Sequence, residues 1–178
     1  MKAEMQAEAA LTRFEQLMLP HMNAAYNLAR WLMRNDSNAE DVVQEAYLRA
    51  FRFFDGFQGE DGRAWLLAIV RNTCRTALQK SGTDSKNTEF QEEIHLVDEA
   101  STETHLLRQD NIDSVRWCIE HLPPDYREVV VLRELQQMSY KEIASAISVP
   151  PGTVMSRLAR ARARLQDCLL LRIPGVRA

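Results

Sequence analysis

The residues best suited to chemistry in this sequence are arginines near its carboxyl end. Arg160, Arg162 and Arg164 alternate with alanines over residues 159–164. Guanidinium groups bind phosphate oxygens and guanine edges, so a row of them on one helix is typical of nucleic-acid contact. Residues 150–178 carry six basic side chains and one acidic one, although the whole chain has a formal net charge of -3. This local basic stripe indicates a phosphate-bearing partner.

A helical wheel separates these arginines from a core face. At about 100° per residue, four apolar side chains fall in one narrow arc: Val154, Leu158, Ala161 and Leu165. The opposite arc holds small side chains with longer ones at its margins: Ser156, Ala159 and Ala163 in the centre, Met155 and Arg162 on one side, Arg160 and Arg164 on the other. A small centre lets the backbone approach the floor of a DNA groove, and basic margins hold phosphates. Arg157 lies nearer the core face, where we expect an internal ion pair.

The segment before this helix completes a DNA-binding motif. Residues 140–147 have the pattern of a short helix, and 148–151 form a tight turn that contains two prolines. The basic helix is expected over 152–170, with a cap near Thr153. The inward residues of the short helix are Ile143, Ala144 and Ile147. This is a helix-turn-helix, in which the second helix enters a major groove; the basic run alone would equally fit a solvated helix face.

The first half of the chain is predicted to form helices and one loop. Apolar side chains recur at helical steps over 11–34, with an interruption at Pro20 where we expect a kink. A second helix is expected over 36–51, with capping residues at its first three positions. Residues 55–62 contain three glycines and are predicted to be a loop. A third helix follows over 64–79, and its expected buried side chains are Trp65, Ala68, Ile69 and Leu78.

The middle and the second half combine a polar linker with more helices. Residues 81–104 are acidic and weakly periodic, which predicts a linker. Helical periodicity returns before two prolines at 123–124, on Leu106, Ile112, Val115, Ile119 and Leu122. A further helix is expected over 125–136, with Val129, Val130 and Leu132 buried.

Composition excludes several classes of protein. The chain has 178 residues, of which 46% are hydrophobic and 26% charged, so wholesale disorder is excluded. Its 6 glycines and 6 prolines are too few for a turn-rich all-β fold. No apolar run approaches the length of a membrane span, and the opening residues are too polar for a secretory signal. We therefore expect a cytoplasmic protein without membrane insertion.

Cysteine and histidine spacings give no sign of a metal or catalytic site. Cys74, Cys118 and Cys168 lie far apart, without the spacing of a zinc site or a disulfide framework, so we expect buried reduced thiols. The 4 histidines do not fall at metal-ligand spacings, and neither a phosphate loop nor a nucleophile elbow is present. The sequence predicts no enzyme activity, no metal and no cofactor.

Four strings in one order carry a resemblance to a known family. They read NAEDVVQEAYLRAFR at 38–52, RAWLLAIVRNT at 63–73, LPPDYREVVVLRE at 122–134, and GTV followed by SRL in the basic helix. Together they resemble the extracytoplasmic-function (ECF) sigma factors of bacterial RNA polymerase. The resemblance implies an all-α fold of two small helical domains joined by an acidic linker, the second containing the helix-turn-helix. The implied boundaries are 1–80, 81–104 and 105–178.

The resemblance also assigns roles to residues. The implied polymerase-binding residues are Asp41, Gln44, Glu45 and Arg49, whose helix would dock on the clamp of the largest subunit. The implied minus-ten residues, which would melt DNA and hold a flipped base, are Phe57, Gln58, Gly59, Arg63, Arg71, Asn72 and Arg75. The implied minus-thirty-five residues are Thr153, Met155, Ser156, Ala159, Arg160, Arg162 and Arg164. The implied partners are core RNA polymerase, through that clamp and the flap of the second-largest subunit, promoter DNA and an anti-sigma factor.

Some alternatives stay open at this level. Phe57 and Trp65 fit an ordinary aromatic core as well as a base pocket. The acidic linker fits either an RNA-mimicking strand or a solvated tether. Two other functions compete with the sigma role: a self-sufficient helix-turn-helix regulator that binds DNA as a dimer, and a sigma mimic that titrates an anti-sigma factor. The docking string at 38–52 argues against the first, and the three alternating arginines argue against the second.

Overall fold

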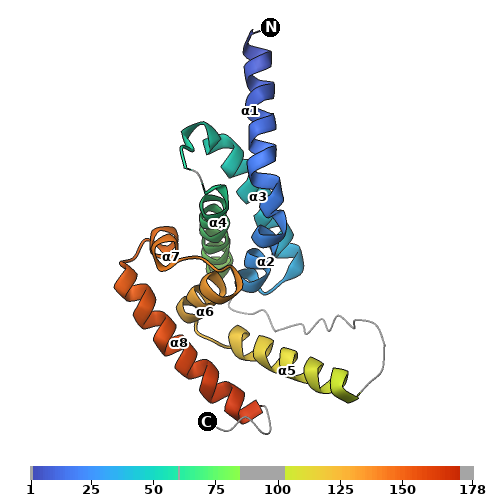
Figure 1. Cartoon of the computed structure of the whole chain (residues 1–178), viewed down its shortest axis with the longest axis vertical. Helices are drawn as coiled ribbons and strands as arrows, with labels where there is room; N and C mark the ends of the chain where they lie inside the picture. Colours follow the sequence, from blue (N-terminus) through green and yellow to red (C-terminus); the bar gives the residue numbers. More distant parts are fainter. Residues whose placement is uncertain (1, 60, 85–102, 173–178) are drawn as a thin grey trace.

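Every element in the part of the chain that the structure describes is helical (Figure 1). This computed structural model describes residues 2–59, 61–84 and 103–172. The all-α fold class is therefore confirmed. We call the described residues up to 84 the first half and those from 103 the second half.

The first half is built from four α-helices and two short 3-10 turns. Their bounds are α1 Lys2–Met18, η1 Leu19–His21, α2 Met22–Met33, α3 Asp36–Phe53, η2 Phe54–Gly56 and α4 Gly62–Asp84. The kink expected at Pro20 is confirmed, because η1 separates α1 from α2 there. The amino-terminal part of α1 projects away from the other helices (Figure 1).

The amino-terminal ends of α3 and α4 are capped by side chains that accept hydrogen bonds from backbone N–H groups. The Asn35 side chain caps α3 by accepting a hydrogen bond from the backbone N–H of Asn38, so the cap lies one residue before the expected positions. Asp36 instead accepts from Arg30 Nε at 2.8 Å. Asp61 accepts from the backbone N–H of Ala64 at 3.1 Å, and this hydrogen bond lowers the pKa of the Asp61 carboxyl.

The buried face of α4 differs from the expected one. Its fully buried apolar side chains are Leu66, Leu67, Val70 and Cys74, whereas Leu78 is exposed. The other three residues expected in the core, Trp65, Ala68 and Ile69, are only partly buried. The physical reason is that α4 has neighbours on two sides, since it packs against α2 and α3 and also against α7. The helix also runs to Asp84, four residues into the segment expected as linker.

The second half contains the helix-turn-helix. Its elements are α5 Glu103–Glu120, α6 Pro124–Val130, the π-helical turn η3 Val131–Leu135, α7 Tyr140–Ile147 and α8 Pro151–Arg172. The bounds predicted for α7 are confirmed, and Ser139 and Glu142 form a reciprocal capping box at its start. Helix α8 begins at Pro151, a residue suited to a first helical position, rather than after a cap at Thr153. Helix α5 includes the last two residues of the predicted linker, 103 and 104, and residues 85–102 of the linker lie outside the described residues.

The periodic stripe predicted for α5 is only half correct. Ile119 and Leu122 are buried, Ile112 and Val115 are exposed, and the fifth predicted residue, Leu106, lies outside the described side chains. Helix α5 packs on α6 and α8 only near its carboxyl end, and its other end extends away from the body (Figure 1). The predicted apolar stripe is therefore covered by neighbouring helices at the carboxyl end of α5 but not at Ile112 and Val115.

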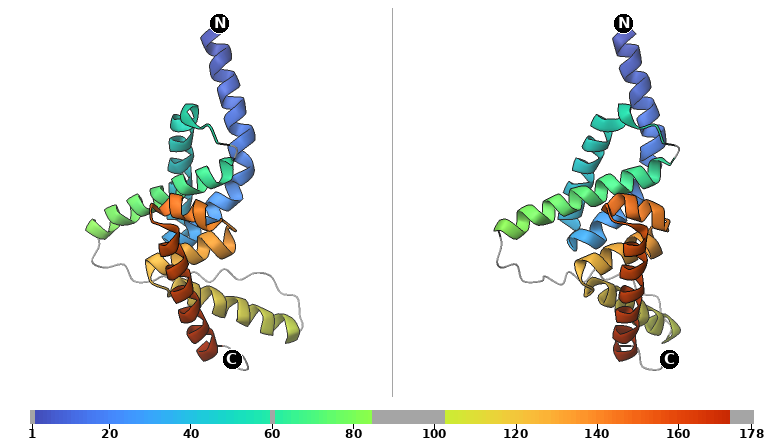
Figure 2. Two further views of the ribbon diagram at one scale, coloured as in Figure 1. Left: turned by 60° about the vertical axis from the view of Figure 1, so that its left-hand side comes forward. Right: turned by 90° about the vertical axis from the view of Figure 1, so that its left-hand side faces the viewer.

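The two halves pack directly against each other. Helix α4 lies against α7, and α2 lies against α6 and η3, as the two views of Figure 2 show for α4 and α7. Buried apolar residues of both halves form one continuous cluster. The carboxyl end of α8 lies at the opposite end of the molecule from the amino terminus (Figure 1).

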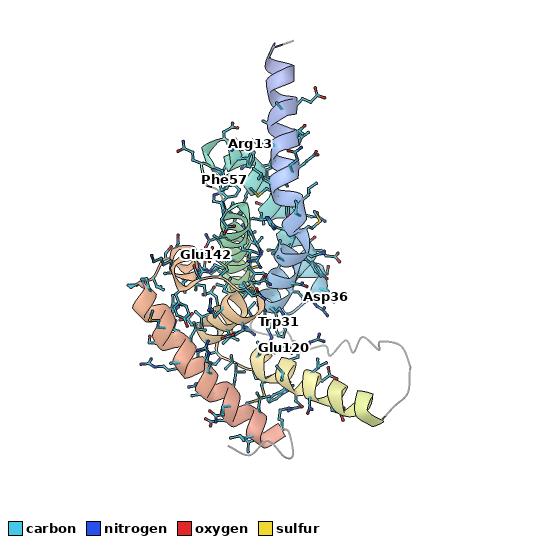
Figure 3. The ribbon with its side chains drawn as sticks, viewed as in Figure 1. Arg13, Trp31, Asp36, Phe57, Glu120 and Glu142 are labelled. Carbon is cyan, nitrogen blue, oxygen red and sulfur yellow. A yellow bond between two sulfur atoms is a disulfide. The ribbon has the colours of Figure 1, made fainter. Side chains whose placement is uncertain are left out.

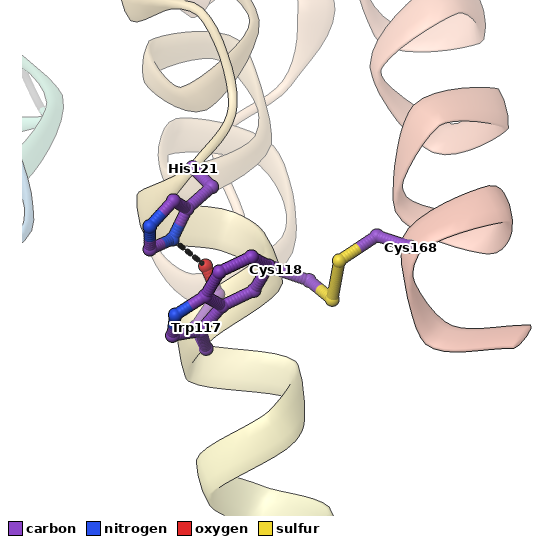
Figure 4. The surroundings of a disulfide bond; sticks show 4 residues. All are labelled: Trp117, Cys118, His121 and Cys168. Carbon is purple, nitrogen blue, oxygen red and sulfur yellow. Dashed lines mark hydrogen bonds between the residues drawn. A yellow bond between two sulfur atoms is a disulfide. The ribbon is translucent and has the colours of Figure 1, made fainter. Parts of the chain in front are cut away.

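The expectation of three reduced cysteines is wrong for two of them. Cys118 of α5 and Cys168 of α8 form a disulfide, while Cys74 is free and buried as expected (Figure 4). The two bonded residues are 50 positions apart and meet only because α5 and α8 pack side by side. A spacing rule along the chain cannot detect such a pair.

The described residues contain neither a membrane-spanning helix nor a cluster of metal-binding side chains. No helix among them is long and apolar enough to cross a membrane. Within the same residues, no three His, Cys, Asp or Glu side chains gather closely enough to hold a metal ion.

Candidate nucleic-acid and polymerase interfaces

Helix α8 presents the face that the wheel predicted. Val154, Leu158 and Ala161 are buried against α6 and α7, with exposed fractions of 0%, 1% and 0%. The small residues of the opposite face, Ser156, Ala159 and Ala163, are all exposed. The turn before α8 is tight because Ser148 adopts a left-handed conformation, with φ of 55°. An accessible stripe of small side chains therefore runs along the second helix of the motif.

Two of the arginines at the margins of this stripe already contact other residues of the protein. Arg162 Nη2 lies 2.6 Å from Glu134 Oε1, and this hydrogen bond raises the pKa of the Arg162 guanidinium. The Arg164 guanidinium lies over the ring of Tyr126, 5.4 Å from its centre. Arg160 and Met155 are exposed. Arg162 would thus have to exchange Glu134 for a phosphate.

Two other residues of the motif make local contacts. The internal ion pair expected for Arg157 is confirmed, because its Nη2 lies 2.9 Å from Asp125 Oδ2. The Ser156 hydroxyl donates to the backbone carbonyl of Thr153 at 3.0 Å. Thr153 is half-buried at the start of the stripe. The Arg157 ion pair links α8 to α6, whereas the Ser156 hydrogen bond lies within α8 itself.

The loop before α4 divides its aromatic and polar residues between core and surface. Phe57 is 6% exposed, and its ring centre lies 4.8 Å from that of Trp65 and 6.0 Å from that of Phe54. Arg13 of α1, labelled near Phe57 in Figure 3, lies over the same Phe54 ring, 5.3 Å from its centre. Gln58 and Gly59 are exposed. The structure therefore favours a core role for Phe57 over the DNA contact implied by the resemblance.

The predicted minus-ten residue Arg71 is buried between the two halves. Its side chain forms a two-point ion pair with Glu128 of α6, with Nε to Oε1 at 2.6 Å and Nη2 to Oε2 at 3.0 Å. Its Nη1 donates to Asn72 Oδ1 at 3.0 Å. The residue as a whole is 5% exposed. In this arrangement the Arg71 guanidinium is paired and shielded rather than an accessible cation, and its minus-ten role stays a prediction.

A second contact of the same kind involves Arg63. Its Nη2 donates to Oε1 of Gln136, a buried residue that follows η3. Asn72 and Arg75 lie on the exposed side of α4. Only part of the predicted minus-ten set is thus accessible, because the second half covers Arg63 and Arg71.

A basic cleft runs between the halves beside this contact. Its lining includes Arg34, Arg71, Arg75, Arg127 and Glu128. Burial lowers the pKa of the Arg127 guanidinium, with the positive charge of Arg34 as a second cause. Arg127 Nη1 donates to the backbone carbonyl of Glu120 at 3.0 Å. Among these arginines, Arg71 joins the two halves through Glu128, whereas the hydrogen bond of Arg127 stays within the second half.

The face of α3 implied to bind polymerase is accessible. Asp41, Gln44 and Glu45 are exposed, and Arg49 Nε donates to Glu45 Oε1 at 2.7 Å. The same face carries Leu48, which is 64% exposed. Sequence reasoning missed Leu48; the signal was available, because an apolar residue one turn after Gln44 falls outside the core stripe. A single exposed leucine is common on protein surfaces, so the relevance of Leu48 to docking rests on its place beside the residues implied to bind polymerase.

Comparison with known proteins identifies the family. The model described as Sigma-70 region 2 matches residues 17–83, and the one described as Sigma-70, region 4 matches residues 112–165. The RNA polymerase sigma-H factor of Pseudomonas aeruginosa is 33% identical over 88% of this chain and 86% of its own length. The ECF RNA polymerase sigma-E factor of Haemophilus influenzae is 34% identical over 79% of this chain and 78% of its own.

Solved structures support the same assignment. The sigma factor RpoE of Bartonella quintana, crystallised with the anti-sigma factor NepR, has a TM-score of 0.73 and 29% identity, covering 88% of this chain and 96% of its own. CnrH, in complex with the cytosolic domain of CnrY, has a TM-score of 0.64 and 26% identity, covering 92% and 93%. The chain belongs to the ECF family of RNA polymerase sigma factors. It is an alternative sigma factor, an initiation factor that directs promoter-specific transcription.

Proposed function

We propose that α3 docks this sigma factor on the clamp of the largest polymerase subunit. The proposal rests on the exposed Asp41, Gln44 and Glu45 and on Leu48 among them. Apolar side chains at the centre of a polar face carry much of the energy of an interface. The pair of Arg49 with Glu45 orients one carboxylate of this face.

We propose further that α8 reads the minus-thirty-five duplex. The single observation that supports this best is the exposed stripe of Ser156, Ala159 and Ala163 on the second helix of the motif. The remaining proposed contacts are Thr153, Met155, Arg160, Arg162 and Arg164. Because the stripe lacks long hydrogen-bonding groups, its arginine margins supply most of the affinity and Met155 supplies an apolar base contact. In this assignment residues 105–178 are the minus-thirty-five domain, which also meets the flap of the second-largest subunit.

Residues 1–80 form the minus-ten domain in this proposal. Gln58 and Gly59 of the loop, with Asn72 and Arg75 of α4, would hold the opened strand, and Arg63 and Arg71 would join them. Those two arginines are engaged by Gln136 and Glu128 in the arrangement described here. The halves must therefore separate before the full set of residues can act, and the segment 81–104 is the tether that allows it.

An anti-sigma factor is the partner expected to oppose this separation. Both solved relatives compared above are structures of complexes with a second protein, and NepR is an anti-sigma factor. A protein that contacts both halves at once would favour the closed arrangement in the same way as Arg71 and Glu128 do.

Site-specific photocrosslinking of the full chain tests these placements. A photoreactive residue at Gln44 is expected to crosslink to the largest polymerase subunit, and one at Ala159 to duplex DNA upstream of the start site. A probe at Glu8 of α1, also exposed, serves as the matched control and is expected to label neither. Crosslinks from Ala159 to polymerase without DNA, or no subunit crosslink from Gln44, would contradict the assignment.

A further inference from the structure

The disulfide between α5 and α8 encloses the whole DNA-reading motif in a covalent loop. Cys118 and Cys168 have Cα atoms 5.9 Å apart and are separated by 50 positions. Between them lie α6, η3, α7 and most of α8. Nothing in the promoter-binding role requires this bond.

The two sulfur-bearing residues differ in accessibility. Cys118 is 1% exposed, whereas Cys168 is half-buried at the edge of a groove. The groove is lined by both cysteines together with Trp117, Arg164, Asp167 and Arg172. Figure 4 shows the bond reaching from the α8 side across to α5 beside Trp117 and His121. A small solute in the groove would meet Cys168 first.

Positive charge surrounds the accessible cysteine. Arg164 and Arg172 lie four residues before and four residues after Cys168, one helical turn away on each side, and both line the same groove. The Arg172 guanidinium is held over the Trp117 ring, 3.9 Å from its centre. Asp167 is the carboxylate among the groove residues. Cationic neighbours stabilise a thiolate, which is the nucleophilic form of cysteine.

The third cysteine, Cys74, lies in a different environment from the bonded pair. Cys74 is fully buried in α4. Burial raises the pKa of its thiol to about 12, so it stays protonated and unreactive at neutral pH. The chain thus contains a shielded thiol at Cys74 and a disulfide that joins the half-buried Cys168 to the buried Cys118.

We propose that Cys168 is a peroxide-reactive cysteine and that Cys118 is its resolving partner. The Cys168 thiolate attacks a hydroperoxide oxygen, the O–O bond breaks, and hydroxide leaves, which forms a sulfenic acid on Cys168. The Cys118 sulfur, losing its proton, then attacks the Cys168 sulfur and releases water. Both thiols are oxidised and hydrogen peroxide is reduced to two waters. A dithiol reductant reverses the bond by exchange.

Oxidation would strengthen the motif without changing its DNA-reading face. The core of α8, formed by Val154, Leu158 and Ala161, packs on α6 and α7 through apolar side chains, and neither bonded cysteine belongs to this apolar cluster. The bond adds a constraint on the unfolded chain and fastens the end of α8 to α5. The expected consequence is a more stable helix-turn-helix domain in cells exposed to peroxide. The chemistry itself requires neither polymerase nor DNA, so its failure would leave the sigma role untouched.

Thiol mapping of the full chain tests the proposal. The protein is reduced, desalted and treated with equimolar hydrogen peroxide, and its thiols are then alkylated under denaturing conditions and located by mass spectrometry. Cys118 and Cys168 are expected to disappear together while Cys74 stays alkylated. In Cys118→Ser, Cys168 is expected to accumulate as a sulfenic acid that dimedone traps; Cys74→Ser is the matched control and should react as the unaltered chain does.

Two further measurements test whether Cys168 is specifically reactive or bonds to Cys118 only because the two residues lie close together. Arg172→Gln is expected to slow bond formation several-fold, whereas Arg160→Gln on the same helix leaves the rate unchanged. Oxidised protein is expected to melt at least about 5 °C above reduced protein. The proposal is overturned if Cys118→Ser gives no dimedone adduct at Cys168, if the bond forms between chains, or if oxidation leaves the melting temperature unchanged.

Discussion

Arg71 of α4 and Glu128 of α6 face each other across the boundary between the two halves. Two hydrogen bonds of 2.6 Å and 3.0 Å join the guanidinium to the carboxylate. Their side chains are only 6% and 13% exposed. A buried ion pair of this kind penalises the loss of either partner, because the remaining charge is left without compensation. When the two halves pack together, this pair buries Arg71, a residue proposed to bind the minus-ten strand. Separation of the halves would expose it.

Replacing Glu128 by Gln is expected to favour the open arrangement. The change leaves Arg71 charged and buried, which penalises closure by about 3 kcal/mol. Small-angle X-ray scattering of the full chain is expected to give a larger radius of gyration than for the unaltered protein.

Two controls distinguish release of this contact from general unfolding. Glu134→Gln removes an exposed carboxylate from the neighbouring turn and should leave the radius unchanged. The double exchange Arg71→Glu with Glu128→Arg should restore a compact protein at least in part. An unaltered radius in Glu128→Gln with helicity retained would show that the pair does not govern closure.

Leu48→Ala is expected to weaken polymerase binding at least about tenfold, as truncation of a central interface residue does. Because Leu48 is 64% exposed, the free energy of unfolding should change by less than about 0.5 kcal/mol. Affinity for core polymerase is measured by titration of a fluorescent derivative. Ile112→Ala on α5, which is 54% exposed, is the matched control. Equal affinities of the Leu48 variant and the unaltered protein would remove Leu48 from the docking face.

Arg160→Ala is expected to reduce promoter-dependent transcription while polymerase binding is retained. If Arg160 contacts a phosphate, the slope of log affinity against log salt should fall by about one unit. Arg172→Ala, at the other end of α8, is the comparison. Unchanged transcription by the Arg160 variant would mean that the wheel places the DNA-facing arc wrongly.

The alkaline stability of the protein should depend on Tyr47. Its hydroxyl donates to the backbone carbonyl of Met18 at 2.9 Å, and burial raises its pKa to about 12. In the unfolded chain this phenol ionises near pH 10. The stabilisation is therefore complete below about pH 10 and is lost as the pH rises toward about 12.

Tyr47→Phe tests this dependence in urea unfolding at several pH values. At neutral pH the variant should lose about 1 kcal/mol, the usual net contribution of one hydrogen bond. Between about pH 10 and 12 its deficit should shrink, because only the unaltered protein gains an ionised unfolded state. A deficit that is constant over this range would contradict the account.

Local patterns in the sequence were sufficient to predict the helix-turn-helix. The apolar spacing of Val154, Leu158 and Ala161 fixed the inward face of α8, and α7 has its predicted bounds. The polar face of α3 was predictable in the same way, because it lies opposite the apolar stripe that packs in the core.

Contacts between distant segments could not be predicted in this way. Glu128 and Gln136 carry no local sign that they meet Arg71 and Arg63, and burial of Phe57 depends on rings from other elements. The disulfide likewise depends on the packing of α5 on α8. In each case the deciding partner lies far away in the sequence, and periodicity reports only which side of a helix is apolar.

The central claim is that this chain confers promoter specificity on core RNA polymerase. Transcription from a pooled random-promoter library, with purified core polymerase in the presence and absence of the protein, measures this directly. The account predicts protein-dependent start sites that share two spaced upstream elements, with the upstream one weakened by Arg160→Ala. Polymerase binding without any promoter-specific starts, or duplex DNA binding without polymerase binding, would contradict it.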